Sequence, residues 1–287
     1  MIIRSFKDLK RKVQGNPPRR VALVDAADGE LIQAVSKAQQ EGLADFILLG
    51  NAKSIHALTA GSELDFDIID SKDPAQDAVK LIHQGRADLL MKGKVSTGTL
   101  LKAVLDKQTG LRKGDLLNHI AVIESPQYHK LLFISDGGIN LYLDQAVFTS
   151  MIHNNVAFLK GLGILDPKIA LMALVESVNP KIPETVIAAE VARSLSEKYQ
   201  IEGPMAPDVA LSRQAAELKG QDSEIAGDVD LLMMSNITAG NHFVKGLVAL
   251  GGCKVGGVIV GAQVPIILLS RSDDAESRYH SILLGLL

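Results

Sequence analysis

The chain has 287 residues, of which 47% are hydrophobic and 22% charged, enough for one large domain or two ordinary ones. Its net charge is −3 and only 4% of its residues are aromatic, which argues against a nucleic-acid-binding surface. The single cysteine excludes an intrachain disulfide, and no apolar run reaches membrane-spanning length, so we expect a cytoplasmic protein that does not bind membranes.

Short apolar runs alternate with helical stretches along the chain. The helix expected after the first strand begins at Asp28 and ends at Gly42, and a later one begins at Asp73 and ends at Gly85. Continuous apolar strands between helices predict an α/β fold with a mostly parallel sheet. The strands are expected at 21–26, 45–50, 87–93, 119–124, 130–136, 168–174, 230–236, 255–261 and 264–269.

Small, polar loops follow four of these strands. They read KGKVSTG at 92–98, SDGGIN at 135–140, SNITAGN at 235–241 and SRSDD at 270–274. In parallel sheets ligands bind beyond the carboxyl ends of the strands, and small residues let the backbone approach a ligand. A single loop of this kind is more often a plain turn, but four on one sheet edge predict a binding site.

The familiar motifs for nucleotides, nucleophilic serines and metals are missing from the sequence. It contains no P-loop, no dinucleotide-binding glycine fingerprint, no G-x-S-x-G elbow and no H-x-x-x-H pair. We therefore expect no metal site, and we interpret His119 and His153 as structural residues.

The chemistry that remains is anion binding. Arg271 offers a fork that matches phosphate oxygens, Ser270 adds a hydroxyl, and a helix expected to begin near Asp273 or Asp274 points its amides the same way. An alternative stays open, in which Ser270 and Asp273 only cap that helix and Arg271 is solvated. The two lysines of the 92–98 loop could likewise be surface residues.

Five segments, taken in order, resemble the phosphate acyltransferases, a family that includes phosphate acetyltransferases and phosphate butyryltransferases. They are 91–112, 134–141, 202–212, 230–241 and 264–277. The resemblance runs from about residue 20 to the end and is closest to the butyryl branch.

The resemblance implies an α/β/α sandwich in two domains with an interdomain cleft, similar to isocitrate and isopropylmalate dehydrogenases. Residues 1–136 and 263–287 would form domain one, and residues 137–262 domain two.

The activity implied by the resemblance is reversible transfer of a butyryl or branched short-chain acyl group from acyl-CoA to inorganic phosphate. Phosphate would attack directly in a ternary complex, with coenzyme A as substrate or product and no permanently bound cofactor. A homodimer or higher homo-oligomer is expected.

The resemblance also implies roles for single residues. Arg271 matches the family's phosphate-binding arginine, Ser270 its transition-state serine, and Lys102 takes the place of a second cleft arginine. The acetyl branch's catalytic aspartate falls on Ser277, so the base is expected to be Glu276 or, one turn earlier, Asp273. The other expected substrate-binding residues are Lys92, Lys94, Ser96, Thr97, Asp136, Gly137, Gly138, Asn236, Gly240 and Asn241.

Three other functions stay open. The first is phosphate acetyltransferase activity. The second is an NAD-dependent hydroxy-acid dehydrogenase of the same fold, for which Asp273 and Asp274 suit a shared metal poorly because adjacent helical residues point about 100° apart. The third is a protein that binds coenzyme A without turnover. The segment 203–208, GPMAPD, either belongs to the family pattern or is a plain turn.

Overall fold

The computed structural model describes residues 3–114, 116–141, 144–268 and 273–287. The chain forms two compact units. The terminal unit consists of Phe6–Asp115 and Gly256–Leu287, and the central unit consists of Leu116–Val255 together with Met1–Ser5. In both this division and the one expected from the sequence, the C-terminal segment rejoins the N-terminal part of the chain. The expected boundaries, near 136 and 262, lie later in the chain, and that domain assignment stays a prediction.

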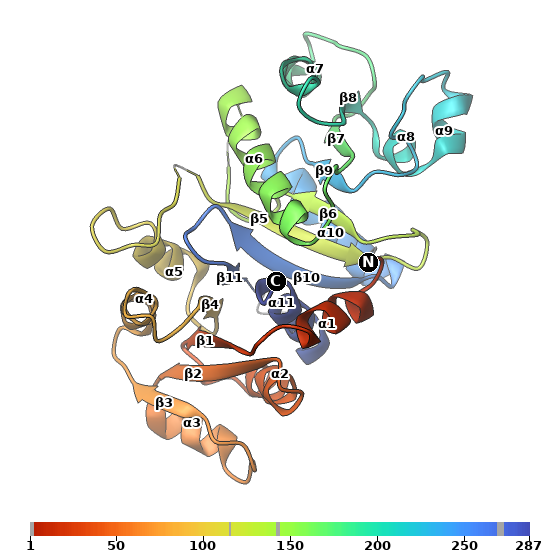
Figure 1. Cartoon of the computed structure of the whole chain (residues 1–287). Coiled ribbons are helices and arrows are strands. Elements are labelled where there is room, and N and C mark those ends of the chain that lie inside the picture. The colour runs from red at the N-terminus through yellow and green to blue at the C-terminus, as the bar shows by residue number, and fades with distance from the viewer. Residues whose placement is uncertain (1–2, 115, 142–143, 269–272) are drawn as a thin grey trace. The chain divides into compact units, whose positions relative to one another are not determined.

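The terminal unit is built on a mostly parallel set of strands (Figure 1) in the order β3-β2-β1-β4-β11-β10. Every neighbouring pair is parallel except β10 and β11. The strands are β1 Arg19–Val24, β2 Ala44–Gly50, β3 Asp67–Asp70, β4 Leu89–Lys92, β10 Lys254–Val260 and β11 Ile266–Ile267. Since β2 and β3 lie on one side of β1 and β4 on the other, the strand order reverses at β1.

The helices of this unit begin where the sequence supplies capping residues. Asp28 accepts a hydrogen bond from the Leu31 backbone N–H, and Asp73 caps a helix with Pro74 in its first turn, as predicted. Gly42 and Gly85 follow the helix ends with φ angles of 67° and 65°. The helices are α1 Phe6–Gln14, α2 Gly29–Gln40, α3 Ala52–Thr59, α4 Pro74–His83, α5 Thr97–Val104 and α11 Ala275–Gly285.

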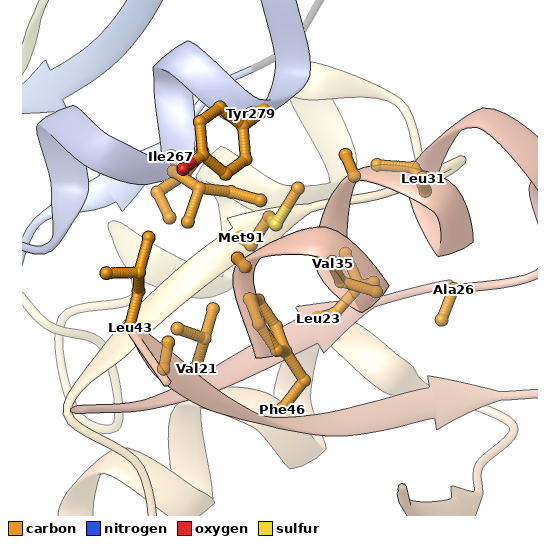
Figure 2. Packing of buried hydrophobic residues seen from close by; sticks show 14 of the residues in the cluster. Val21, Leu23, Ala26, Leu31, Val35, Leu43, Phe46, Met91, Ile267 and Tyr279 are labelled. Carbon is orange, nitrogen blue, oxygen red and sulfur yellow. The ribbon is translucent and has the colours of Figure 1, made fainter. Parts of the chain in front are cut away.

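The core of the terminal unit joins segments that are far apart in the sequence. Figure 2 shows Ile267 of β11 and Tyr279 of α11 in the same apolar cluster as Leu23 of β1, Met91 of β4 and Val35 of α2. This core fixes β11 and α11, and Ile267 pairs with Met91, next to the last residue of β4.

The central unit has its own mostly parallel strands in the order β5-β6-β9-β7-β8, with β5 and β6 antiparallel. The strands are β5 Asn118–Glu124, β6 Leu132–Ser135, β7 Ile169–Met172, β8 Ile201–Met205 and β9 Leu231–Met233. The helices are α6 Gln145–Gly161, α7 Pro183–Leu195, α8 Pro207–Leu211, α9 Arg213–Leu218 and α10 Ile237–Gly251. Cys253 is buried in this unit's core, as a small apolar side chain would be.

Two strands, β8 and β3, were not predicted from the sequence. The segment 203–208 is no plain turn: β8 runs through Gly203 and Pro204 and pairs with β7 on one side, at the end of the strand order. Proline is tolerated at such an edge, and a Cβ on Gly203 would lie only 2.6 Å from Cβ of Leu171. The short β3 was missed because its four residues carry no continuous apolar run.

Both units confirm the α/β class with mostly parallel strands. Within the described residues, no helix combines the length and apolar character needed to cross a membrane.

Candidate active site

The loop after β4 is locked to the end of β1. The backbone N–H of Gly93 donates to the carbonyl of Val24 at 2.8 Å, and that of Lys94 donates to the carbonyl of Asp25 at 2.9 Å. A Cβ at position 93 would lie 2.3 Å from the Asp25 carbonyl oxygen, so only glycine allows this approach. Because the strand order reverses at β1, this is the place where open α/β sheets bind ligands.

The two lysines of this loop have different surroundings. Lys92, the last residue of β4, is 3% exposed, and its Nζ donates to the Gly93 carbonyl at 3.1 Å. Lys94 is exposed. The expected cationic site therefore contains one buried and one solvated ammonium group.

The rest of the 92–98 loop starts α5. The Ser96 hydroxyl accepts from the Thr99 backbone N–H at 3.0 Å and so caps the helix, whose first residue is Thr97. Lys102 lies exposed in the last turn of α5. Capping accounts for Ser96 by itself, and the substrate-binding roles of these three residues stay predictions.

The C-terminal segment contributes a strand, β11, beside β4. Ile266 and Ile267 pair in parallel with Leu90 and Met91, so β11 and β4 end side by side. Ser270 and Arg271 lie outside the described residues. On their C-terminal side, Asp274 caps α11 by accepting from the Ser277 backbone N–H at 2.8 Å.

The two candidate bases differ in position. Glu276 lies in the first turn of α11, with its side chain 59% exposed and its Oε1 3.8 Å from Nε2 of His280. Asp273 precedes the cap, and its carbonyl accepts a hydrogen bond from Nε of Arg278 at 2.9 Å. Asp274, and not Asp273, is therefore the residue whose side chain caps the helix.

Arg278 is a residue that sequence reasoning missed. It is 4% exposed, and its Nη1 lies 2.5 Å from Oδ1 of Asp28, the cap of α2. Burial raises the pKa of Asp28, but the Leu31 N–H and the guanidinium outweigh it, so the pKa lies below its usual value. A pair separated by 250 positions leaves no local signal in one sequence.

Asp136 organises the loop after β6 in the central unit. Its carboxylate is fully buried and accepts from the backbone N–H groups of Gly138 and Ile139, at 2.7 and 3.0 Å, and from Nδ2 of Asn140 at 2.6 Å. The backbone N–H of His119 donates to it as well, at 3.3 Å. These contacts give Asp136 a loop-shaping role, and direct contact with substrate stays a prediction.

The loop after β6 and the start of α10 lie in contact, since β6 and β9 are neighbouring parallel strands. Nδ2 of Asn241 donates to the Gly137 carbonyl at 3.0 Å. A Cβ on Gly240 would lie 2.3 Å from the Asp136 carbonyl oxygen. Asn236 caps α10 by accepting from the Ala239 backbone N–H at 2.9 Å.

His119 lies against this loop and was expected to be structural. A Cβ on Gly138 would touch its ring at 3.3 Å, and burial lowers the pKa of the imidazole while the charge of Asp136 opposes that change. Its Nδ1 is buried without a hydrogen-bond partner among the described residues. The position of His119 at the start of a strand did not predict this buried Nδ1.

Comparisons with known proteins identify the family to which the chain belongs. The family described as "Phosphate acetyl/butaryl transferase" matches residues 68–285. A phosphate butyryltransferase of Clostridium acetobutylicum is 38% identical over 297 aligned positions, covering 100% of this chain and 98% of the relative.

Comparison with solved structures also finds a member of this family. A branched-chain phosphotransacylase from Enterococcus faecalis V583 matches with a TM-score of 0.83 and 33% identity, over 93% of this chain and 98% of its own. A 4-hydroxythreonine-4-phosphate dehydrogenase from Burkholderia phymatum shares the fold alone, with a TM-score of 0.54 and 16% identity over 94% and 97% of the two chains. The family match covers most of the chain and the relatives are matched over nearly their whole length, so the chain belongs to the phosphate acetyl/butyryl transferase family of acyltransferases.

Proposed function

We propose that the enzyme transfers a butyryl or branched short-chain acyl group reversibly between coenzyme A and inorganic phosphate. The observation that carries the proposal is the parallel pairing of β11 with β4, which ends at Lys92, together with the Ser270–Arg271 motif that follows β11 in the sequence. The names of the butyryl and branched-chain relatives support the choice of acyl group.

In the proposed mechanism a phosphate oxygen attacks the thioester carbonyl, the C–S bond breaks, and coenzyme A leaves as a thiolate that takes a proton. Arg271 and Lys92 hold the phosphate, and Ser270 donates a hydrogen bond to the developing charge. Attack is direct in a ternary complex, since the sequence offers Ser270 no evident histidine partner to make it a nucleophile. Ping-pong kinetics or a trapped acyl-serine would contradict this step.

The length of the acyl chain should affect the rate in a graded way. Butyryl has two more methylenes than acetyl, and burying each contributes about 0.8 kcal/mol, so butyryl-CoA should be favoured somewhat over tenfold. A pocket that holds four carbons cannot exclude two by steric clash, and acetyl-CoA should remain a weak substrate.

The experiment is a thiol-release assay with saturating phosphate and excess EDTA, run with acetyl-, butyryl-, isobutyryl- and isovaleryl-CoA. We expect phosphate-dependent release with kcat/KM highest for a four- or five-carbon chain. A butyryl-to-acetyl ratio of one or less would indicate the acetyl activity instead. Isotherms that show coenzyme A binding without thiol release would favour the ligand-binding alternative.

The dehydrogenase alternative is tested in parallel by NAD reduction with hydroxy acids and added magnesium. The proposal requires no reduction there, and any turnover in that assay without thiol release would overturn it.

We also propose that the chain forms a homo-oligomer through the central unit. Within α10, which the structure describes in full, Gly240 alone is buried, and Leu250 is 91% exposed. Other strongly exposed leucines of this unit, Leu174 and Leu218, are 70% and 82% exposed. Exposed apolar side chains gathered on one surface are typical of protein–protein contacts.

A further inference from the structure

His119 lies at the carboxyl edge of the central unit's strands. β5 runs antiparallel to β6, so the start of β5 lies beside the carboxyl end of β6. Since β6, β9 and β7 are parallel, their carboxyl ends share this edge, which is where open α/β sheets bind ligands. The His119 side chain is therefore placed among the loops that a ligand of this unit would contact.

A network of asparagine and serine side chains fixes the backbone next to His119. Nδ2 of Asn118 donates to Oγ of Ser135 at 3.0 Å and to Oδ1 of Asn155 at 2.6 Å. Oδ1 of Asn118 accepts from Nδ2 of Asn154 at 3.0 Å. Asn118, Ser135 and Asn155 are fully buried, and a satisfied network of buried polar groups makes its surroundings rigid. The start of β5 is thus held in one position.

The nearest carboxylate does not pair with the His119 ring. Asp136 accepts from the backbone N–H groups of Gly138 and Ile139 and from Nδ2 of Asn140. From His119 it accepts the backbone N–H, at 3.3 Å. Burial lowers the pKa of the imidazole, and the charge of Asp136 opposes that change without reversing it. The ring is therefore neutral near pH 7.

The surroundings of Nδ1 decide which ring nitrogen of His119 carries the proton. Nδ1 is buried without a hydrogen-bond partner among the described residues, whereas the side chain as a whole is partly exposed. A buried N–H without an acceptor is rarer than a buried acceptor without a donor, so the proton belongs on Nε2. A Cβ on Gly138 would lie 3.3 Å from Cγ and 3.4 Å from Nδ1, so the loop covers that side of the ring. Nε2 lies at the other end.

A neutral donor of this kind suits one of the two substrates better than the other. Phosphate is charged before the reaction and is matched by cationic groups. The carbonyl oxygen of a thioester is uncharged before the reaction and becomes negative in the transition state, where a preorganised N–H stabilises it most.

We propose that His119 is a catalytic residue that donates a hydrogen bond through Nε2–H to the carbonyl oxygen of the acyl thioester. This rests on the proposed function, since it takes acyl-CoA as the substrate. When a phosphate oxygen attacks the carbonyl carbon, the π electron pair moves onto the carbonyl oxygen, and His119 stabilises that charge while keeping its proton. The pair returns as the C–S bond breaks and coenzyme A leaves as a thiolate.

The test compares H119F and H119Q with H153F and H153Q. Phenylalanine keeps a ring and removes the donor, whereas the side-chain amide of glutamine can donate near the position of Nε2. His153 is a matched control, because burial also lowers its pKa and its ring contacts Tyr199 at 5.9 Å between centroids. Tyr199 precedes β8, so His153 lies toward the opposite edge of the strands.

We expect H119F to lower kcat for butyryl-CoA at saturating phosphate about 100-fold, as loss of one oxyanion donor does. Its Kd for coenzyme A, measured by titration calorimetry, should stay within twofold of wild type. H119Q should restore kcat to within about tenfold, and both His153 variants should leave it within twofold. An unchanged kcat in H119F, or a loss that H119Q does not relieve, would show that His119 is structural. A higher Kd with unchanged kcat would place the donor on coenzyme A, and either result overturns the proposal.

Nuclear magnetic resonance of wild type tests the donor without any variant having to turn over. The seven histidines are labelled with ¹⁵N, and the His119 signals are assigned by their loss in H119Q. We expect a bare Nδ1, a protonated Nε2, and a shift of the Nε2 resonance when butyryl-CoA is added without phosphate. A proton on Nδ1 would contradict the proposal.

The same measurement separates this proposal from the proposed function. If thiol release is normal and the Nε2 resonance does not move, the proposal for His119 alone fails. If the resonance moves but wild type shows no thiol release, the proposed function is wrong and His119 remains a contact of the acyl-CoA. If neither is seen, both fail.

Discussion

At the scale of single residues, the two lysines after β4 are expected to contribute unequally. Lys92 is buried and Lys94 exposed, and a charge acts more strongly where solvent does not screen it. Replacing Lys92 with Met should raise KM for phosphate at least tenfold. Replacing Lys94 with Met should raise it less than threefold, and this smaller effect should disappear in 1 M salt, where the screening length is about 3 Å. Equal effects of the two substitutions would contradict the assignment of the buried lysine to the site.

The general base is a second question at this scale. Glu276 is open to solvent at the start of α11, whereas the backbone of Asp273 is held by Arg278. We therefore expect Glu276→Gln to slow attack of coenzyme A on the acyl phosphate while leaving the Kd for coenzyme A nearly unchanged. Stopped assays in the reverse direction measure this. A damaging Asp273→Asn with a mild Glu276→Gln would transfer the role to Asp273.

At the scale of elements, the sequence predicted what local chemistry decides. The caps at Asp28 and Asp73 form as expected, because an Asx side chain before an apolar repeat satisfies free amides wherever the helix lies. The predicted strands formed where apolar runs were continuous, and β8 was missed because proline at a sheet edge looks the same in sequence as proline in a turn.

The candidate site was less predictable than the fold. Small, polar loops predicted a site at the carboxyl ends of the strands, but the use of each polar group depends on partners far away in the chain. The carboxylate of Asp136 accepts hydrogen bonds from its own loop, and Arg278 pairs with Asp28, which caps another helix. Such contacts are set by tertiary packing, which periodicity and spacing do not encode.

A pair of glycines in α10 tests the close packing of the two central-unit loops. Gly246 has open space around its Cα, so Gly246→Ala should stabilise the protein by up to about 1 kcal/mol through helix propensity. The same change at Gly240 pushes a methyl group to 2.3 Å from the Asp136 carbonyl oxygen. There we expect a net loss of about 1–3 kcal/mol, as for other overpacked sites. Urea unfolding of both variants measures the difference, and a stabilising Gly240→Ala would show that the contact is loose.

At the scale of the whole molecule, the C-terminal segment packs against the N-terminal part of the chain. The last strand and helix enter the core of the terminal unit, so that Ile267 and Tyr279 pack with residues of β1 and α2 (Figure 2). Truncation of this segment would therefore remove core residues as well as Ser270 and Arg271. The Ser-Arg motif stands late in the sequence because it follows β11, the last strand of this unit.

We expect the chain to assemble into a homo-oligomer through α10. The inner face of the helix packs on the central-unit core through Phe243, Val244 and Leu247, while Val248 and Leu250 are 38% and 91% exposed. A closed homodimer buries the same patch twice, which makes a short apolar surface on one helix effective. We expect wild type to run as a dimer or larger assembly in multi-angle light scattering.

The double variant Val248→Glu and Leu250→Glu should shift that assembly toward the mass of one chain, because it places like charges opposite one another across a self-complementary contact. Leu58→Glu is the matched control, since Leu58 is a 43% exposed leucine on α3 of the terminal unit, and it should leave the mass unchanged. Circular dichroism of both proteins verifies that they are folded. A wild-type protein that is monomeric at micromolar concentration would refute the homo-oligomer, and a double variant that keeps the wild-type mass would move the contact away from α10.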